Sequence, residues 1–426
     1  MEMIHAGQYK NKEKNMKKSA CLDVVSKSLN WFEKSSVMEP SNGFWGVAER
    51  VYLCPDKELS KKVFESFNSF TDYGDWSVVE SRRADCNFQA AWLFLLAAEA
   101  TGSADAKKIA KNLLDYLYCR SGLLNRGSSD GAKEGMAGVW NWSHTCWRPR
   151  LWFDDNSWTL AIPLMIAERY PDLAEKYNMK FWADKLAREI TPAFRRTFCA
   201  SLGKPDADMS DPEEIWNGRP LLPHWGGLVC FALSRAVRSG VGDRADMLQM
   251  IREYHDYLDK DADDRLNVSE LAYAVICCTA AYQIDKEERY LTLAKRFADR
   301  IIAKADPVTG NIPAEHYEAP SGPHLVDTIY TVNWCLLGIQ NLVKAGGAAE
   351  YEELYEKLLA LFAGIQDNDE SRAFNGCWRG MFDMNTGTWG GGDRYEGGAG
   401  SIYSGWTNAP IAIAFANEAL GISLVD

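Results

Sequence analysis

The sequence lacks several features that would place the protein in a membrane, on a nucleic acid or around a phosphate group. No run of about eighteen apolar residues occurs, so we expect no membrane-spanning helix. The net charge of −12 argues against a nucleic-acid partner. No phosphate-binding GK[ST] sequence is present. The N-terminus shows no apolar signal segment, and we expect a cytoplasmic or periplasmic protein.

The eleven cysteines show no metal-binding spacing. No CxxC pair occurs, and only Cys277 and Cys278 are neighbours. We interpret the cysteines as reduced, mostly buried thiols of a reducing compartment. The aspartate-rich run 259–270 has Asp264 at the position where a calcium loop needs glycine. We therefore expect neither a bound metal nor another cofactor.

The sequence does contain a regular alternation of two kinds of helix. Amphipathic, charged helices such as 104–118 alternate with helices such as 268–282 that are apolar nearly all round, and a helix of the second kind must be buried on every side. Six buried and six half-exposed helices predict an all-α (α/α)6 toroid, with one domain over 19–426 and a flexible tail over 1–18. The twelve predicted helices are 19–35, 84–101, 104–118, 154–170, 180–198, 225–239, 243–260, 268–282, 286–304, 323–346, 349–367 and 406–420, with a small further helix at 56–69.

The connections between these helices predict where a functional site lies. Turns from inner to outer helices are short, whereas most connections from outer to inner helices are long, and long irregular loops are usually functional. In a ring of antiparallel hairpins the long loops share one end, which we call the mouth. Sugar C–H faces pack on indole rings, so we expect a carbohydrate site there. Nine of the sixteen tryptophans fall in these loops: Trp45, Trp76, Trp140, Trp142, Trp147, Trp152, Trp216, Trp378 and Trp389.

Two adjacent aspartates, Asp154 and Asp155, start an inner helix between aromatic residues in the stretch WFDDNSW. Helix capping explains one of them. The flanking rings favour a site, because partial desolvation raises a carboxylate pKa and allows one acid to hold a proton beside a charged neighbour. Asp85 begins another inner helix at the mouth. It is either a cap or the second carboxylate that glycoside hydrolysis requires. Asp154, Asp155 and Asp85 are therefore the candidate catalytic residues.

Aromatic, histidine and charged side chains of the mouth are the candidate substrate-binding residues. The histidines either orient sugar hydroxyls or are structural. The arginines of the mouth indicate either an anionic substrate such as a uronic acid or pairing with local aspartates. The glycine-rich run 389–408 is either a ligand-binding loop or a surface loop. The candidates are Trp45, Trp142, His144, Trp147, Arg148, Trp152, Trp158, His224, Trp225, Trp378, Arg379, Asp393, Arg394, Tyr395 and Trp406.

On the stretch Trp152-Phe153-Asp154-Asp155 and Pro163, the chain resembles the six-hairpin glycosidases, and locally the unsaturated glucuronyl and unsaturated rhamnogalacturonyl hydrolases. That resemblance implies Asp154 as general acid/base and Asp85 as its partner. The implied reaction protonates a C4=C5 double bond and adds water at C5. The adjacent aspartates are also similar to those of endo-α-1,6-mannanases, which implies Asp154 as nucleophile and Asp155 as acid.

We therefore expect a glycoside hydrolase that acts on an oligosaccharide containing a uronic acid, through aspartate acid/base catalysis. Two alternatives remain open. N-acylglucosamine epimerases have a similar toroid and imply a sugar isomerase in which His144, His224 and His316 converge. A carbohydrate-binding protein without chemistry is the other. The expected partner is an oligosaccharide, with no nucleic acid and no membrane, and the sequence does not specify the oligomeric state.

Overall fold

The computed structural model describes residues 2–40, 42–53, 69–127, 136–145, 151–203, 216–260, 266–315, 322–390 and 400–426. Six helices form a closed inner ring, because each packs against the next and the last packs against the first. They are α3 (Ala84–Thr101), α5 (Phe153–Arg169), α8 (Gly226–Ser239), α10 (Val268–Asp285), α12 (Val332–Lys344) and α14 (Ala409–Leu420).

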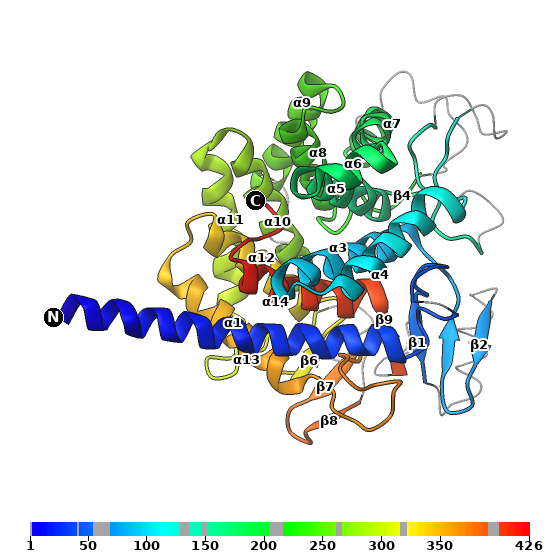
Figure 1. The fold of residues 1–426 in the computed structure, drawn as a ribbon. Coiled ribbons are helices and arrows are strands. Elements are labelled where there is room, and N and C mark those ends of the chain that lie inside the picture. The colour runs from blue at the N-terminus through cyan, green and yellow to red at the C-terminus, as the bar shows by residue number, and fades with distance from the viewer. Residues whose placement is uncertain are drawn as a thin grey trace.

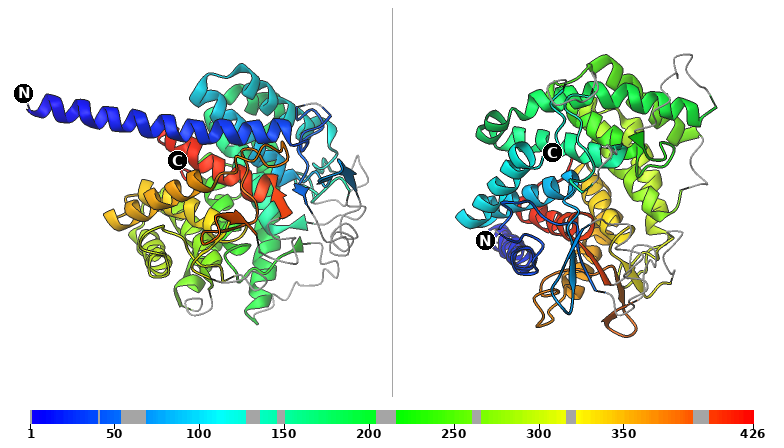
Figure 2. Two further views of the ribbon diagram at one scale, coloured as in Figure 1. Left: turned by 90° about the horizontal axis from the view of Figure 1, so that it is seen from below. Right: turned by 90° about the vertical axis from the view of Figure 1, so that its right-hand side faces the viewer.

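Six more helices cover this ring from outside, and each packs against at least one inner helix (Figures 1 and 2). They are α1 (Glu2–Lys34), α4 (Ala104–Asp115), α7 (Met179–Ser201), α9 (Arg244–Lys260), α11 (Glu288–Ile302) and α13 (Ala349–Ile365). The predicted (α/α)6 toroid is therefore confirmed. In the part of the chain that the structure describes, no helix combines the length and the apolar character needed to cross a membrane.

The two kinds of helix behave as their sequences predict. In α10 every residue from Val268 to Ala281 is buried, whereas α11 buries one face, with Leu291 and Phe297 inward, and exposes its charged residues. Each fully buried Leu, Ile, Val or Phe side chain stabilises the fold by about 1.5–3 kcal/mol. The helix α3 begins and ends at the predicted residues, and its end is closed by Gly102 in the left-handed conformation.

The prediction of one helix over 323–346 is wrong in its first part. Residues Leu325–Asp327 form strand β6, and α12 begins only at Val332. The Asp327 carboxylate accepts backbone N–H bonds from Ile329 (3.0 Å) and Tyr330 (3.2 Å), and it accepts a bond from the Thr331 hydroxyl (2.8 Å). These local side-chain bonds hold a turn in place of the first helical residues.

Other boundaries also differ from the prediction. The helix α1 begins at Glu2 and so includes most residues of the expected tail, and its first part projects from the body in Figure 1. A short helix α6 (Pro171–Tyr177), started by Pro171, was not predicted. Two π-helical turns, η1 (Tyr116–Arg120) and η5 (Ser404–Asn408), adjoin α4 and α14. The small helix expected at 56–69 lies almost entirely outside the described residues.

The outer-to-inner connections contain short strands that the sequence analysis treated as loops. They form three small sheets, in the orders β2-β3-β1-β9, β4-β5 and β6-β7-β8. The opposite end has short turns and the helix α6, and there Gly102, Gly240 and Gly421 close inner helices with φ of +75°, +70° and +73°. The strands are β1 (Arg50–Tyr52), β2 (Phe70–Asp72), β3 (Ser77–Val79), β4 (Leu151–Trp152), β5 (Trp216–Asn217), β6 (Leu325–Asp327), β7 (Met381–Asp383), β8 (Thr388–Trp389) and β9 (Ser401–Tyr403).

Candidate active site

The first turns of α3 and α5 carry the candidate catalytic acids. Asp85 lies in the first turn of α3, and Asp154 and Asp155 lie in the first turn of α5. The helix N-terminus stabilises a nearby anion by about 0.3–1 kcal/mol. None of the three aspartates is more than 5% exposed. They are therefore not solvated caps, and each needs a partner for its charge.

One guanidinium group, that of Arg83, joins three buried carboxylates. Its Nε and Nη2 donate to the two oxygens of Asp85 at 3.1 and 2.9 Å, and its Nη1 donates to Glu49 at 3.0 Å. Its Nη2 also donates to Asp155. On the far side of Glu49, Arg50 approaches Oε2 at 3.3 Å. We call Glu49, Arg83, Asp85 and Asp155 the carboxylate cluster.

The carboxylate cluster shifts the pKa values of its members. Burial and the charges of Asp85 and Asp154 raise the pKa of Asp155 well above its usual range, although Arg83 opposes the shift. Burial alone would lower the pKa of Arg83, but the charges of Asp155 and Asp85 raise it well above its usual value. Asp155 therefore holds its proton to higher pH than an exposed aspartate, beside a guanidinium that stays charged.

The other side of Asp154 faces an aromatic stack. Its Oδ2 lies 3.2 Å from Nε2 of His224. The imidazole lies between Trp225 and Tyr273, with ring centroids 4.4 and 4.9 Å away and planes within 15° of parallel. The backbone N–H of His224 donates to the buried Glu270 at 2.7 Å. These contacts hold the imidazole in one orientation beside Asp154.

Several buried polar atoms around this stack have no hydrogen-bond partner among the described residues. They are Oδ1 of Asp154, the hydroxyl of Tyr273, and Nε1 of Trp225 and of Trp406. The Trp406 ring lies 5.3 Å from that of His224. A buried unpaired group costs about 1–3 kcal/mol, so a local concentration of them is typical of a ligand site. We call Asp154, His224, Trp225, Tyr273 and Trp406 the open cluster.

Aromatic rings next to Arg83 connect the two clusters. The Arg83 guanidinium carbon lies 5.5 Å from the ring centre of Trp142 and 5.6 Å from that of Trp406. These distances are those of cation–π contacts. Trp152 is half-buried at the helix start, and its Nε1 also has no partner in the described part of the chain.

Asparagine side chains fix the mouth loops on three inner-ring segments. In each case the amide oxygen accepts the backbone N–H of a loop residue, and the amide nitrogen donates to the carbonyl of the same residue. Such a double bond sets the position of the loop, because it satisfies both backbone groups at once. The pairs are Asn87 with Val47, Asn156 with Trp140, and Asn408 with Trp378.

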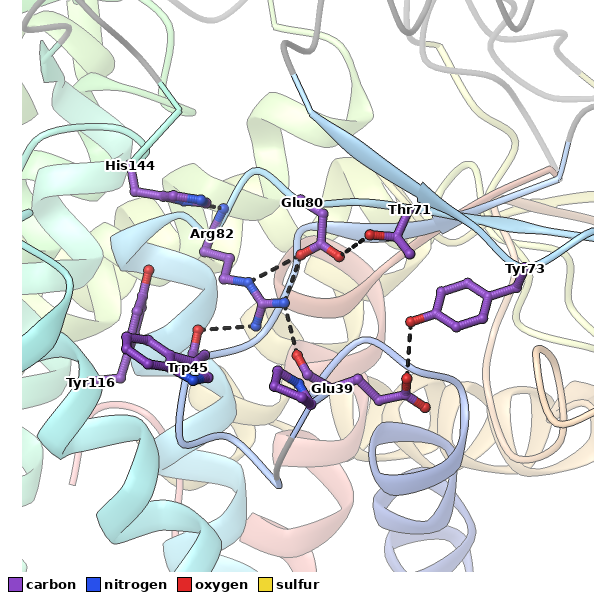
Figure 3. Close-up of a pocket in the computed structure, with 9 residues that line it drawn as sticks. Glu39, Trp45, Thr71, Tyr73, Glu80, Arg82, Tyr116 and His144 are labelled. Atoms are coloured by element: carbon purple, nitrogen blue, oxygen red, sulfur yellow. Dashed lines mark hydrogen bonds and ion pairs between the residues drawn. The ribbon is translucent and has the colours of Figure 1, made fainter.

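Trp45 and His144 lie in a separate cleft of about 520 Å³ beside the carboxylate cluster (Figure 3). The guanidinium of Arg82 lies in this cleft and donates to Glu80, to the carbonyls of Trp45 and Gly46, and to that of residue 39. Nδ1 of His144 accepts the backbone N–H of Arg82, and burial and the Arg82 charge lower the pKa of His144. The imidazole is therefore neutral near pH 7 and offers Nε2–H as a donor. We call this the side cleft.

Some sequence candidates are buried in the core or paired within the protein. Trp378 has no exposed surface and donates to the Phe362 carbonyl at 2.8 Å, so the expectation that it binds substrate is not supported. Trp158 is 3% exposed and stacks on Trp334 inside the ring. Arg379 pairs with Asp367 at 2.6 Å. Asp85, with no exposed surface, supports Arg83 and does not face the open cluster.

The remaining candidates, Trp147, Arg148, Asp393, Arg394, Tyr395 and His316, lie outside the described residues. The sequence analysis missed Glu49, Tyr273 and Glu270. Glu49 was hidden because strand β1 brings it to the site from a distant part of the sequence. Tyr273 and Glu270 lie in a helix that is apolar nearly all round. Its sequence therefore indicates a core helix and gives no sign of a site.

No protein-family model matches the sequence, and none of the curated proteins matches it. Solved structures with the same fold do match. A D-mannose isomerase has a TM-score of 0.58 at 13% identity, covering 94% of this chain and 97% of the isomerase. An unsaturated glucuronyl hydrolase specific for heparin has a TM-score of 0.57 at 10% identity, covering 96% of this chain and 100% of the hydrolase.

A third match is an inactive α-1,6-mannanase variant, GH76A of Salegentibacter sp. HEL1_6, in which two adjacent aspartates are replaced and which is in complex with α-1,6-mannotriose. Its TM-score is 0.54 at 11% identity, covering 93% of this chain and 99% of the mannanase. At these identities the matches establish the fold alone. The expected resemblance to six-hairpin glycosidases is thereby confirmed at the level of the (α/α)6 fold.

Proposed function

We propose that the protein is a glycoside hydrolase that cleaves an oligosaccharide at the mouth, with Asp154 and Asp155 as its two carboxylates. One observation carries this proposal: the open cluster combines an unpaired carboxylate oxygen with unpaired donors on aromatic side chains. A sugar offers hydroxyl groups to such polar atoms and C–H faces to such rings. Its binding would satisfy groups that are costly to leave buried and unpaired.

The roles of the two aspartates follow from their surroundings. Asp154 has the free oxygen and reacts directly with the anomeric carbon or with the attacking water. Asp155 holds a proton because of its raised pKa and delivers it to the departing glycosidic oxygen. Water supplies the hydroxyl group of one product and the proton that restores Asp155. Asp85 is a positioning residue, because it acts on Asp155 through Arg83. An α-1,6-mannanase of the same fold is inactive when its two adjacent aspartates are replaced, in line with these roles.

Three arginines near the carboxylate cluster favour a neutral sugar at the open cluster. Arg50 and Arg83 pair with Glu49, and Arg82 pairs with Glu80. Their positive charges are neutralised by these carboxylates. The buried acids around them disfavour the binding of a further anion. The expected preference for a uronic acid therefore draws no support from these three arginines.

The side cleft is suited to a second sugar unit. Trp45 is 47% exposed and offers an indole face, while Nε2–H of His144 and the hydroxyl of Tyr116 provide polar contacts on the same wall (Figure 3). The backbone step from Arg82 to Arg83 joins the cleft to the carboxylate cluster. A substrate of several sugar units would occupy both places.

A sugar isomerase is the second candidate, and His224 favours it. The imidazole lies at the centre of the open cluster and within 3.2 Å of a carboxylate, which is a suitable arrangement for proton abstraction. Among the described residues, however, His224 is the only histidine of that cluster, since His144 lies in the side cleft and His255 is buried between the rings. The described part of the chain therefore places no second histidine beside His224 to form an acid–base pair.

The deciding experiment is a substrate screen with three arms. The purified protein is incubated with neutral α-manno-oligosaccharides, with saturated uronides and with lyase-generated unsaturated disaccharides. Reducing-sugar release, loss of the unsaturated chromophore and chromatography of isomerised sugars are followed. We expect release of reducing sugar from a neutral oligosaccharide and none with Asp154→Asn. Isomerisation without hydrolysis, or no turnover in any arm, contradicts the proposal.

A further inference from the structure

A second cluster of reactive side chains lies between the rings, in the middle of its helices and not at the mouth. It consists of His255 on α9 and of Cys277 and Cys278 on α10, and we call it the thiol–imidazole cluster. The imidazole nitrogen and the two sulfur atoms all lie within 4.8 Å of one another. None of the three residues is more than 2% exposed. Across the described part of the chain, no other group of three His, Cys, Asp or Glu residues is this compact.

The imidazole of His255 is oriented as metal-binding histidines usually are. Its Nδ1 lies 2.7 Å from the Ile251 carbonyl oxygen, which can only accept, so Nδ1 carries the proton. Nε2 therefore carries the lone pair, which faces the sulfur of Cys277 at 3.8 Å and accepts from its thiol. A backbone carbonyl on the other ring nitrogen fixes the tautomer and ring orientation at many metal sites.

We propose that His255, Cys277 and Cys278 bind a thiolate-preferring divalent metal ion such as Zn²⁺. In a tetrahedral zinc site the bonds are about 2.3 Å to sulfur and about 2.0 Å to nitrogen, which places ligand atoms roughly 3.5–3.8 Å apart. The sulfur–nitrogen distance already has this value. Two thiolates and a neutral imidazole around Zn²⁺ form an uncharged unit. The buried site therefore escapes the cost of burying a net charge.

A cavity of about 190 Å³ between α9 and α11 gives the ion a route to this cluster. His255 and Tyr290 line it, and their rings are in edge contact at 4.7 Å. Its rim includes Asp256 and Asp259, which pair with Arg289 and Arg296 of the same rim at 3.0 and 2.8 Å, so the entrance carries no net charge that would repel a cation. Water or an added ligand in this cavity would complete a four-coordinate site. Buried cysteines usually serve as small apolar groups, but that role needs no imidazole lone pair beside them.

The test titrates the full-length protein, reduced and stripped of metal by a chelator, with Co²⁺. A cobalt–thiolate site gives an intense charge-transfer absorption. We expect this band to saturate at one equivalent of Co²⁺ and to disappear when Zn²⁺ is added. Loss of a residue that only supports a metal ligand weakens metal binding by up to about 100-fold. Cys277→Ser and Cys278→Ser each remove a direct ligand, so each should weaken binding by at least this factor. Cys335→Ser, which removes a fully buried thiol of α12, is the matched control and should bind as the wild type does.

Two results would overturn the proposal. One is the absence of the charge-transfer band at stoichiometric Co²⁺ in the wild type. The other is an unchanged band in both serine variants. If those variants do not fold, thermal unfolding of the wild type decides. Zn²⁺ must then raise the unfolding midpoint, and a chelator must reverse the rise, because an ion that binds the native state stabilises it. An unchanged midpoint counts against the site.

Discussion

The first turns of α3 and α5 both carry buried aspartates, yet their surroundings differ. Asp85 receives two bonds from Arg83 and has no exposed surface. Asp154 shares one oxygen with His224 and keeps the other without a partner among the described residues. The carboxylate cluster therefore satisfies its charges within the protein, whereas the open cluster leaves polar atoms for a ligand. We infer that Asp85 maintains geometry through Arg83, and that Asp154 performs the chemistry with Asp155 as its proton donor.

The largest expected effect comes from removing the unpaired carboxylate. Asp154→Asn keeps the shape of the side chain but removes its charge, so turnover should fall by about 10²–10⁴-fold, the usual contribution of a general acid or base. The free energy of unfolding should change little, because no internal ion pair with an arginine is lost. Steady-state rates and denaturant unfolding check both parts. A variant that keeps full turnover would assign the chemistry to another group.

Removing the guanidinium of the carboxylate cluster should act mainly on stability. Arg83→Met leaves Glu49, Asp85 and Asp155 buried without their shared cation, and breaking a buried pair typically costs about 3–5 kcal/mol. Denaturant unfolding measures the loss. The control Arg188→Met breaks an exposed pair with Asp184 and should cost far less, because solvent screens exposed charges. Equal losses in the two variants would show that the cluster adds nothing specific.

The raised pKa of Asp155 predicts a pH dependence of stability. A carboxyl group whose folded pKa lies above its unfolded value of about 3.9 stabilises the protein fully below that value. This contribution is lost as the pH rises through the folded pKa. Asp155→Asn cannot ionise, so the wild type should lose stability relative to the variant as pH rises, by at most about 1.4 kcal/mol per pH unit. Unfolding free energies at several pH values from 5 to 8 give this difference. Parallel curves would mean that Asp155 is not perturbed.

The smallest effect is expected at the unpaired hydroxyl of the open cluster. Tyr273→Phe should lower kcat/KM by roughly 10-fold, equivalent to one neutral hydrogen bond, without loss of stability. Tyr254→Phe is the matched control, since this hydroxyl on α9 is also buried and has no partner among the described residues. It should leave kcat/KM unchanged. Equal activity losses in the two variants would indicate a general packing effect.

The fold could be predicted because its signal is local. Periodicity over one helix length reports which faces are buried, and this located the helices of both rings. The strands could not be predicted in this way. Two or three residues such as Arg50–Tyr52 carry little pattern, and their pairing partner Ser401–Tyr403 lies far away in the sequence.

The site could be predicted only in part. The stretch WFDD marked Asp154 and Asp155, because acids between aromatic residues at an inner-helix start are conspicuous. Arg82 and Arg83 are adjacent and of the same type, so the sequence does not distinguish them. In the structure Arg82 holds loop carbonyls in the side cleft, whereas Arg83 joins three carboxylates. The thiol–imidazole cluster was also hidden, since His255 comes from a different helix from the two cysteines.

The most direct test is a crystal structure of Asp154→Asn with the oligosaccharide that the wild type turns over. The account predicts a sugar unit with a ring face on Trp225 or Trp406, and with hydroxyl groups bonded to the Tyr273 hydroxyl and to the side chain at position 154. These are the atoms that lack partners among the described residues. A sugar that binds elsewhere and leaves those atoms unpaired would contradict the account.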